Sequence, residues 1–321
     1  MTGWIILAHG DCDGICSASL ALSAKKNAKL VFTNPANLLS ELKSIHEENI
    51  IIVDIALTPK HRKEIVSELR RLGSRGEVIY LDHHPLPPGL SLRKLPVKTV
   101  SGSKGACASE LTYIFFEKDI DPEMSRVAVY GAIGDYSDNT PRIQHLLKKW
   151  DKRELYLESG ILVAALEGVK KGDFDFKRGL VNYLSKNKLP SSDRNLVEIA
   201  LREAERDEQM RHVVKNMVKT HGRVSYVVNV EWSLGKAATY ARAYGNTIVG
   251  VAADERGENI DLSVRSVGLK NLHKITSDIA ERLGGVGGGH INAAGARIPQ
   301  GKLSEFIEML DERLRHLTTG R

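Results

Sequence analysis

The sequence predicts an α/β protein with a parallel-sheet N-terminal domain, a helical connector and a smaller α/β C-terminal domain. Three observations predict this class: strand-like apolar runs alternate with helical patterns in the first half, charged helical spacing dominates the middle, and strand-like runs return after Arg223. The length of 321 residues also favours two domains over one core. We therefore expect domains at residues 1–145 and 223–321, joined by the connector 146–222.

Four short runs in the first half have the apolar, β-branched composition of buried strands. They are Trp4–His9, Lys29–Asn34, Ile50–Ala56 and Glu77–Asp82. Helical patterns follow at Ile15–Lys26, Leu38–Glu47, Lys60–Leu72 and Ser103–Glu117, whereas Val127–Ile133 fits either a strand or an apolar helix. This alternation predicts a parallel sheet.

After the charged helical segment Ser192–Lys219, strand-like runs return. We expect strands at Arg223–Val230, Thr247–Ala253, Asn259–Val264 and Ala293–Ile298. A helix is expected over Leu272–Leu283, and the glycine-rich segment after it is expected to be a loop.

The bulk composition indicates a cytoplasmic protein. The net charge is +6, a mild basic excess that suits a polyanionic partner but is explained more simply by a solvated surface. The three cysteines, Cys12, Cys16 and Cys107, imply no disulfide framework and fit a reducing compartment. The sequence predicts neither a signal peptide nor a membrane-spanning helix.

Acids and histidines gather where the predicted strands end. They are His9, Asp11 and Asp13 after the first strand, Asp54 after the third, Asp82, His83 and His84 after the fourth, and Asp135 after a later apolar segment. In a parallel sheet these ends lie at one edge, where α/β folds bind ligands. Segments far apart in the sequence are therefore expected to converge there.

Carboxylates gathered at one edge repel one another, and divalent cations remove that repulsion. Mixed oxygen and nitrogen ligands favour Mn²⁺ over Mg²⁺, and two ions bridged by one carboxylate would suit phosphoryl transfer. A helix N-cap would explain Asp13 alone, but it would not explain the whole set. Cys12 and Cys16 lack a second pair with zinc-finger spacing, so we interpret them as core residues.

The second signal is a segment with five glycines between Gly284 and Gly289, followed by His290. Its backbone amides could bind phosphate, and His290 could donate to a phosphate oxygen. The pattern is neither a dinucleotide fingerprint nor a P-loop. Upstream, Arg265 suits bidentate phosphate contact, although an ordinary surface arginine is an equal alternative.

Together these residues resemble the DHH phosphoesterase family, in particular its RecJ-like and nano-RNase branch of archaeal type. The matching elements are, in chain order, His9 to Gly14, Asp54, Asp82-His83-His84, Asp135, Ser263-Val264-Arg265 and Gly287-Gly288-Gly289-His290. The last two resemble the Ser-x-Arg and Gly-Gly-Gly-His elements of the DHH-associated C-terminal domain. Ile291 departs from the family, which often has proline there.

The resemblance implies a role for each position. One Mn²⁺ would be held by His9, Asp11 and Asp54, and a second by Asp13, Asp54, His83 and Asp135, with Mg²⁺ as the alternative ion. His84 would face the scissile phosphate, and Asp82 would orient a ligand histidine. Substrate phosphates would be bound by Ser263, Arg265, Gly287, Gly288, Gly289 and His290, with the active site in a cleft between the domains.

We therefore expect a Mn²⁺-dependent exonuclease that hydrolyses single-stranded DNA or RNA to mononucleotides, with 3′→5′ polarity and a link to DNA repair or replication. The alternative is a nano-RNase, phosphoadenosine-phosphate phosphatase or cyclic-dinucleotide phosphodiesterase acting on short oligonucleotides. A catalytically silent replication scaffold is disfavoured because every expected ligand position is filled.

The expected partners are single-stranded nucleic acid or short oligonucleotides, a replication or repair protein, and a second copy of the chain, but no membrane. Arginines of the connector could follow a longer backbone or form a solvated face: Arg194, Arg202, Arg206 and Arg211. Tyr136 is the nearest candidate for base stacking, although a packing role explains it more simply.

Overall fold

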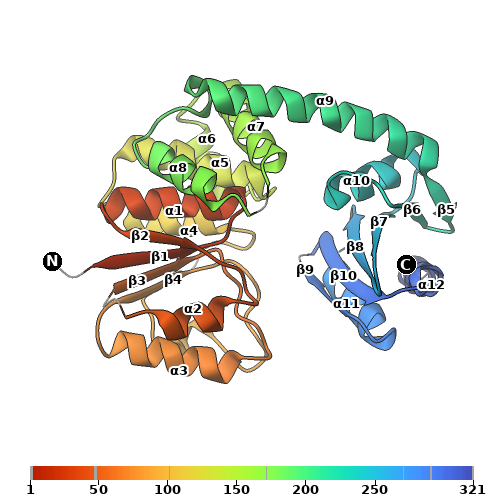
Figure 1. Ribbon diagram of the computed structural model, residues 1–321, viewed down its shortest axis with the longest axis horizontal. Helices are drawn as coiled ribbons and strands as arrows, with labels where there is room; N and C mark the ends of the chain where they lie inside the picture. Colours follow the sequence, from red (N-terminus) through yellow and green to blue (C-terminus); the bar gives the residue numbers. More distant parts are fainter. Residues whose placement is uncertain are drawn as a thin grey trace. The chain divides into compact units, whose positions relative to one another are not determined.

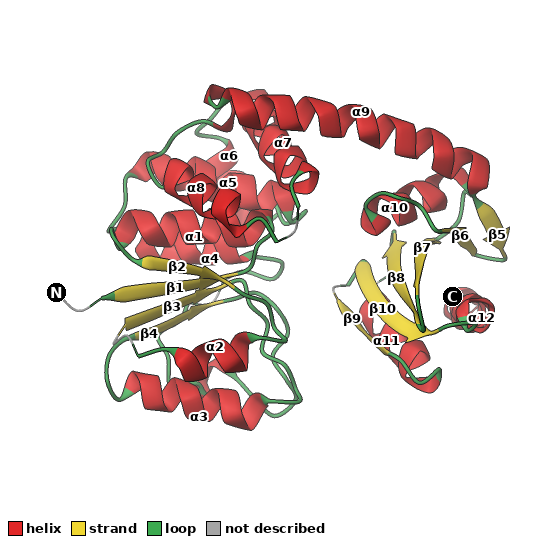
Figure 2. Ribbon diagram, viewed as in Figure 1, coloured by secondary structure: helices red, strands yellow, loops and turns green. Residues whose placement is uncertain are grey.

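The structure is a computed structural model that describes residues 3–46, 49–100, 102–170, 172–269, 271–289 and 291–319. The chain divides into two compact units, Met1–Glu203 and Ala204–Arg321. Each unit has its own core and sheet, which is four-stranded and parallel in the first unit and six-stranded and mixed in the second (Figures 1 and 2). The predicted α/β class, with a parallel N-terminal sheet and a smaller C-terminal domain, is confirmed.

The sheet of the first unit has the strand order β2-β1-β3-β4. Its strands are β1 (Trp4–Ala8), β2 (Lys29–Phe32), β3 (Asn49–Val53) and β4 (Val78–Leu81). The register aligns Ile6 of β1 with Ile51 of β3, and Ile51 with Ile79 of β4. Helices cover both faces of this sheet, which is why its central strands are apolar along their whole length.

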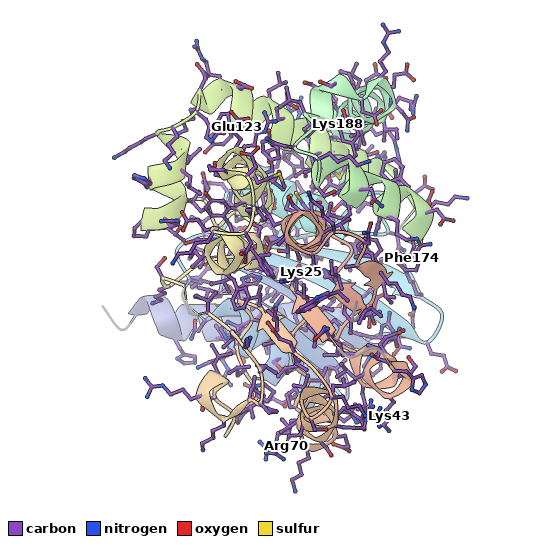
Figure 3. All side chains as sticks on the ribbon, turned by 90° about the vertical axis from the view of Figure 1, so that its left-hand side faces the viewer. Lys25, Lys43, Arg70, Glu123, Phe174 and Lys188 are labelled. Atoms are coloured by element: carbon purple, nitrogen blue, oxygen red, sulfur yellow. The ribbon has the colours of Figure 1, made fainter. Side chains whose placement is uncertain are left out.

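One face of the sheet is covered by α2 (Leu38–Ser44) and α3 (Arg62–Gly73) (Figure 1). In α3 the apolar residues Ile65, Leu69 and Leu72 recur at helical spacing and are buried against the sheet. Charged side chains of the same two helices, such as Lys43 and Arg70, point outward (Figure 3).

The other face is covered by a larger group of helices. They are α1 (Cys12–Ala24), α4 (Ala108–Phe116), α5 (Ser125–Gly134), α6 (Pro141–Leu147), α7 (Lys152–Gly168) and α8 (Phe174–Leu184), and short 3₁₀ turns lie at Leu92–Lys94, Pro122–Met124 and Pro190–Ser192. The segment Val127–Ile133, for which the sequence allowed a strand or a helix, lies within α5. Two helices of the predicted connector, α7 and α8, pack against α5 and α1 in the first unit's core.

The second unit begins within α9 (Arg194–Met217), a single helix that contains the boundary between the units. Its strands are β5 (Lys219–His221), β6 (Val224–Val228), β7 (Val249–Arg256), β8 (Asn259–Ser266), β9 (Val286–Gly289) and β10 (Ala293–Pro299). Their order is β5-β6-β7-β8-β10-β9, and β6 pairs in parallel with β7 whereas the other pairs are antiparallel.

Helices also cover both faces of this second sheet. The helix α10 (Leu234–Tyr244) packs with the end of α9 on one face, and α11 (Leu272–Arg282) and α12 (Leu303–Thr319) lie on the other. No helix in the described part of the chain is both long and apolar enough to cross a membrane.

The structure contradicts the expected glycine-rich loop and contains elements that were not expected from the sequence. The glycine-rich segment was expected to be a loop, but β9 is an edge strand, because its backbone pairs with β10 and places Gly288 opposite Gly295. The strand β5 and the helices α10 and α12 were not predicted. In α10 the buried side chains are alanines, which give little hydrophobic contrast, whereas α12 has a clear apolar stripe.

We expect Gly250→Ala to destabilise the second unit by about 1–3 kcal/mol, because a Cβ on β7 at this point would lie 1.9 Å from the carbonyl oxygen of Ala238 in α10. Urea denaturation followed by circular dichroism measures the loss. Gly179→Ala is the matched control: it lies inside α8 with open space around it and should stabilise by about 1 kcal/mol. Equal stability of Gly250→Ala and the unchanged protein would contradict the close packing of α10 on β7.

Candidate metal centre

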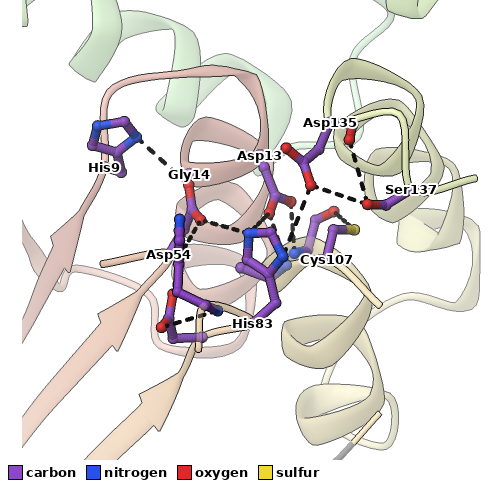
Figure 4. A network of polar contacts seen from close by, with 12 residues as sticks. His9, Asp13, Gly14, Asp54, His83, Cys107, Asp135 and Ser137 are labelled. Carbon is purple, nitrogen blue, oxygen red and sulfur yellow. Dashed lines mark hydrogen bonds and ion pairs between the residues drawn. The ribbon is translucent and has the colours of Figure 1, made fainter. Parts of the chain in front are cut away.

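The strand order brings together residues that lie far apart in the sequence. Because β1, β3 and β4 are parallel neighbours, the residues that follow them meet at one edge of the sheet. His9 follows β1, Asp54 follows β3, and Asp82 follows β4. The C-terminal end of α5 adds Asp135 to the same place (Figure 4).

Two groups of three side chains at this edge could each hold a metal ion. They are His9, Asp11 and Asp54, and Asp13, His83 and Asp135, and in each group the ligand atoms lie within 4.8 Å of one another. A third such combination, Asp54, His83 and His84, overlaps both. The structure thus brings together every metal-ligating residue expected from the sequence.

Asp54 connects the two groups through its two carboxylate oxygens. Its Oδ2 lies 3.7 Å from Nδ1 of His9, and its Oδ1 lies 3.5 Å from Nε2 of His83. His83 in turn lies 3.9 Å from carboxylate oxygens of Asp13 and of Asp135. Figure 4 shows these carboxylates around the His83 ring. A single carboxylate that faces two ligand groups is the arrangement required to bridge two cations.

Asp54 is also the residue whose surroundings most require a cation. It is 3% exposed, and its Oδ2 is buried without a hydrogen-bond partner. Its φ of 56° lies in the left-handed region, which non-glycine residues rarely adopt. A buried carboxylate without a donor is costly, and a divalent ion would remove that cost. The donor set therefore fits the metal ions expected from the sequence.

Asp13 is held in place by the start of α4, a contact that no local sequence pattern predicts. Its Oδ2 accepts a hydrogen bond from the backbone N–H of Ala108 at 2.7 Å, and its Oδ1 accepts one from Ser109 at 2.8 Å. These amides begin α4, whose own N-cap residue Cys107 makes no side-chain cap. Asp13 is not the N-cap of α1, because it lies in the first turn of that helix and Asp11 is the N-cap.

Asp82 and His84 form a hydrogen-bonded pair beside Asp54. His84 Nδ1 donates to Asp82 Oδ1 at 2.8 Å, and the hydroxyl of Tyr80 donates to Asp82 Oδ2 at 2.8 Å. Asp82 therefore orients His84 rather than one of the two histidines in the metal groups, and Tyr80 was missed because its place in β4 is typical of a core residue. His84 Nδ1 lies 3.9 Å from Asp54 Oδ1.

A lysine from α8 also reaches the site. Lys177 is 6% exposed, and its Nζ lies 2.8 Å from the point that a Cβ on Gly10 would occupy. Gly10 stands between His9 and Asp11, so the lysine places a positive charge beside the first metal group. The sequence contains no signal for this residue, because its helix lies in the predicted connector.

Burial and mutual repulsion shift the pKa values of these groups. Burial, followed by repulsion from Asp135, raises the pKa of Asp13 to about 6. Burial and then the charges of Asp11 and Asp13 raise the pKa of Asp54 well above its usual range. Burial opposes protonation of His84, but its hydrogen bond to Asp82 and the surrounding carboxylates raise its pKa. Without cations, the site therefore retains protons at pH values where free carboxyls have lost them.

The predicted phosphate-binding residues lie in the second unit. Ser263 and Arg265 are two residues apart on β8 and so share one face of the sheet. On β9, a Cβ at Gly288 would meet nothing within 4 Å, whereas Gly287 packs against the backbone of α11 and Gly289 has a φ of 135°. His290 lies outside the described residues.

The guanidinium of Arg265 lies beside the start of α10. Its Nη2 is 2.6 Å from the point that a Cβ on Gly235 would occupy, and its Nη1 donates to the carbonyl oxygen of Val264 at 3.0 Å. The arginine thus lies along the sheet, next to a helix N-terminus, which favours anions.

We expect the metal-free protein to lose stability as the pH rises from about 4 to about 7. The raised pKa of Asp13 means that the folded form holds more protons between 3.8 and about 6, and the raised values of His9 and His84 continue this trend above 6.5. The pKa of Asp82 is lowered, so its contribution to stability is lost only as the pH falls below 3.8, outside this range. Ligands that must lose protons bind metal better at higher pH.

Thermal melts with and without Mn²⁺ at pH 5.5 and 7.5 test this expectation. The Mn²⁺-induced rise in Tm should be larger at pH 7.5, and the metal-free Tm should be lower there than at pH 5.5. A metal-induced shift that is the same at both pH values would contradict the proton-coupled site.

Sequence profiles place this chain in a known family. The profile described as the DHH family, N-terminal domain, matches residues 4–134, and that described as the DHHA1 domain matches residues 205–316. No curated protein is similar enough in sequence to count as a match.

Among solved structures, a DHH-domain protein described as a member of a family of ribosomal proteins has a TM-score of 0.69 at 18% identity, covering 98% of this chain and 86% of its own. RecJ with Mn²⁺ from Thermus thermophilus has a TM-score of 0.67 at 16% identity, covering 98% of this chain and 52% of its own. A pGpG-specific phosphodiesterase, PggH, from Vibrio cholerae has a TM-score of 0.60 at 12% identity, covering 98% of this chain and 99% of its own.

At these identities the solved structures show a shared fold. The two profiles together span most of the chain, in the order in which the motifs occur. The chain therefore belongs to the DHH family of metal-dependent phosphoesterases, with a DHH domain followed by a DHHA1 domain.

Proposed function

We propose that this protein is an exonuclease that hydrolyses single-stranded DNA or RNA to mononucleotides with two divalent ions, Mn²⁺ in preference to Mg²⁺. The observation that carries the proposal is Asp54, a buried carboxylate whose two oxygens face two separate ligand groups. A site that binds one structural ion would not need such a bridge. Paired cations suit displacement at phosphorus, where attacking and leaving oxygens both carry negative charge.

The ligand assignment follows the distances. We propose that His9, Asp11 and Asp54 hold one ion, and that Asp13, Asp54, His83 and Asp135 hold the other. When bound, the ions supply positive charge for the phosphoryl oxygens and make a water molecule more acidic.

His84 is proposed to contact the scissile phosphate or the leaving oxygen. Its hydrogen bond to Asp82 fixes the orientation of the ring and, in the metal-free site, raises the pKa of the imidazole. A protonated imidazole next to a developing oxyanion can donate a hydrogen bond or a proton to it. Asp82 thus acts through His84 and does not need to touch the substrate.

The second unit is proposed to bind substrate phosphates. Arg265 offers a planar guanidinium on the same sheet face as Ser263, and Gly288 leaves its backbone uncovered. Gly287, Gly289 and His290 complete the proposed phosphate-binding set. Together these groups would hold an anionic ligand without reading its base.

We propose 3′→5′ polarity and a cytoplasmic role in DNA repair or replication, with a partner protein from that machinery. The alternative is an enzyme for short oligonucleotides, and one observation favours it. The arginines of α9 alternate with acidic residues, and Arg211 is paired with Glu208, so the helix forms no basic stripe that would follow a long backbone. RecJ and the pGpG-specific phosphodiesterase share this fold and represent the two alternatives.

Cleavage of end-labelled strands with Mn²⁺ distinguishes these activities. The protein is incubated with a dinucleotide and with a long oligomer, each as DNA and as RNA, beside Asp82→Ala and Asp135→Ala. Progressive shortening of the long strands, reduced by about 10²-fold or more in both variants, is the expected result, and the labelled end gives the polarity. Asp119→Asn, an exposed acid on the same unit, is the matched control and should cleave normally.

Cleavage confined to the dinucleotides would replace the exonuclease with the short-oligonucleotide enzyme. Absence of cleavage of every substrate with both Mn²⁺ and Mg²⁺ would refute the proposed function.

We expect Asp54→Asn to stabilise the metal-free protein while removing most of its response to metal. Asparagine keeps the shape, tolerates a positive φ and carries no buried charge, so Tm without metal should rise at pH 7.5. The unchanged protein should gain about 2.7 kcal/mol at a Mn²⁺ concentration about one hundred times Kd, and the variant far less. Isothermal titration and thermal melts measure both effects. A variant that binds Mn²⁺ as tightly as the unchanged protein would exclude Asp54 as the bridge.

A further inference from the structure

Tyr136 directly follows Asp135 of the second metal group and has no role in the core. It is 90% exposed, the highest exposure among the large apolar and aromatic side chains in the described chain. The simpler interpretation of Tyr136 as a packing residue is therefore wrong. A single exposed ring is common on protein surfaces. Tyr136 differs from an ordinary exposed ring because it directly follows a residue of the second metal group and has a left-handed backbone.

The backbone at Tyr136 favours a different residue. The helix α5 ends in a Schellman cap, in which the N–H of Tyr136 donates to the carbonyl of Ile133 at 3.2 Å and that of Ser137 donates to Ala132 at 2.8 Å. Tyr136 occupies the left-handed position of this cap with a φ of 55°. Glycine normally fills this position because it has no Cβ.

The other left-handed residues in the described chain follow the usual preference. The non-glycine residues with positive φ are Asn27, Asp54, Tyr136, Asn187, Asn229 and Asn246. Asparagine is the residue that tolerates this conformation best after glycine. The two that are not asparagine, Asp54 and Tyr136, both lie at the metal centre, and of these only tyrosine falls outside the residue types enriched in this conformation. Strained residues of this kind cluster at functional sites, where the side chain matters more than the local cost.

The loop that carries Tyr136 is fixed on both sides. Ser137 Oγ donates to Asp135 Oδ2 at 3.0 Å, and the hydroxyl of Tyr156 on α7 donates to Asp138 Oδ2 at 2.6 Å. With the helix cap, these bonds define the direction in which Tyr136 leaves the backbone. The ring is thus presented to solvent from a preorganised loop, which lowers the entropy lost when a ligand binds to it.

We propose that Tyr136 is a base-stacking platform for the nucleotide whose phosphate lies at the Asp13–His83–Asp135 group. This inference rests on the proposed function, and it adds that the substrate must carry a nucleobase at that position. Every base offers a flat face, so stacking would set affinity without selecting sequence. A ligand that presents only a phosphate, such as a polyphosphate or a sugar phosphate, would gain nothing from the ring.

The test compares two ligands that differ by the base. Binding of adenosine 5′-monophosphate and of ribose 5-phosphate to the Mn²⁺-loaded protein is measured by isothermal titration, in the unchanged protein, Tyr136→Asn and Tyr136→Phe. We expect Tyr136→Asn to weaken binding of the nucleotide by about 5- to 150-fold and to leave binding of the sugar phosphate unchanged. Tyr136→Phe keeps the ring and should keep the preference for the nucleotide.

A stability measurement separates this role from a structural one. Because asparagine tolerates the left-handed conformation, Tyr136→Asn should raise Tm even as nucleotide binding weakens. Asn27→Gly, an exposed left-handed position after α1, is the control and should alter Tm without altering either affinity.

Equal loss of both ligands in Tyr136→Asn, or an unchanged nucleotide affinity, would overturn the stacking role. The binding readout does not depend on cleavage. If the nucleotide preference is present and lost in Tyr136→Asn while no strand is cleaved, the proposed function fails and the stacking role stands. If strands are cleaved and the variant binds both ligands like the unchanged protein, the proposed function stands and the stacking role fails.

Discussion

The repulsion among carboxylates around Asp54 is the constraint on which the rest of the first unit depends. An apolar parallel sheet brings several acids to one edge, and burial prevents water from screening their charges. Hydrogen-bond donors and basic side chains surround these acids. The first amides of α4 donate to Asp13, histidines lie between the carboxylates, and Lys177 lies beside Gly10. These groups reduce the repulsion, and metal ions would remove what remains.

The same edge concentrates the conformational strain of the chain. Elsewhere in the described residues, left-handed positions are occupied by glycine or asparagine, and the core follows regular periodicities. At the metal centre, an acid and a tyrosine occupy such positions instead. The regular sheet and its two helical layers supply the stability that allows this local cost. The residues that stabilise the first unit thus lie in its core, whereas the strained residues lie at the edge of the sheet that carries the metal centre.

The sequence was sufficient to predict those features that depend on short-range pattern and on the geometry of parallel sheets. Continuous apolar runs indicated β1, β3 and β4, and parallel strands place the residues after them together, so that His9, Asp54 and His83 were expected to meet. The composition of the cluster then indicated divalent metals, because few other ligands suit it.

Other features depend on contacts that no local pattern records. Asp13 and the amide of Ala108 are 95 positions apart, and Lys177 arrives from a helix that was assigned to the connector. The strand β9 was missed because glycines disfavour strands, and pairing with β10 outweighs that preference. The close packing of α5 on α1 was also not predicted: a Cβ on Gly134 would lie 2.6 Å from Sγ of Cys12.

The hydrogen bonds of Asp13 give this carboxylate two functions, one of which is independent of any metal. It supplies the cap that α4 lacks, so replacing it would leave two buried amides without acceptors and weaken the attachment of that helix. During evolution, a descendant that abandoned catalysis would still be under selection to keep this aspartate. An aspartate at this position in a relative therefore shows only that the helix contact is kept. The loss of Asp54 or His9, whose side chains cap no helix, would be better evidence that catalysis has been lost.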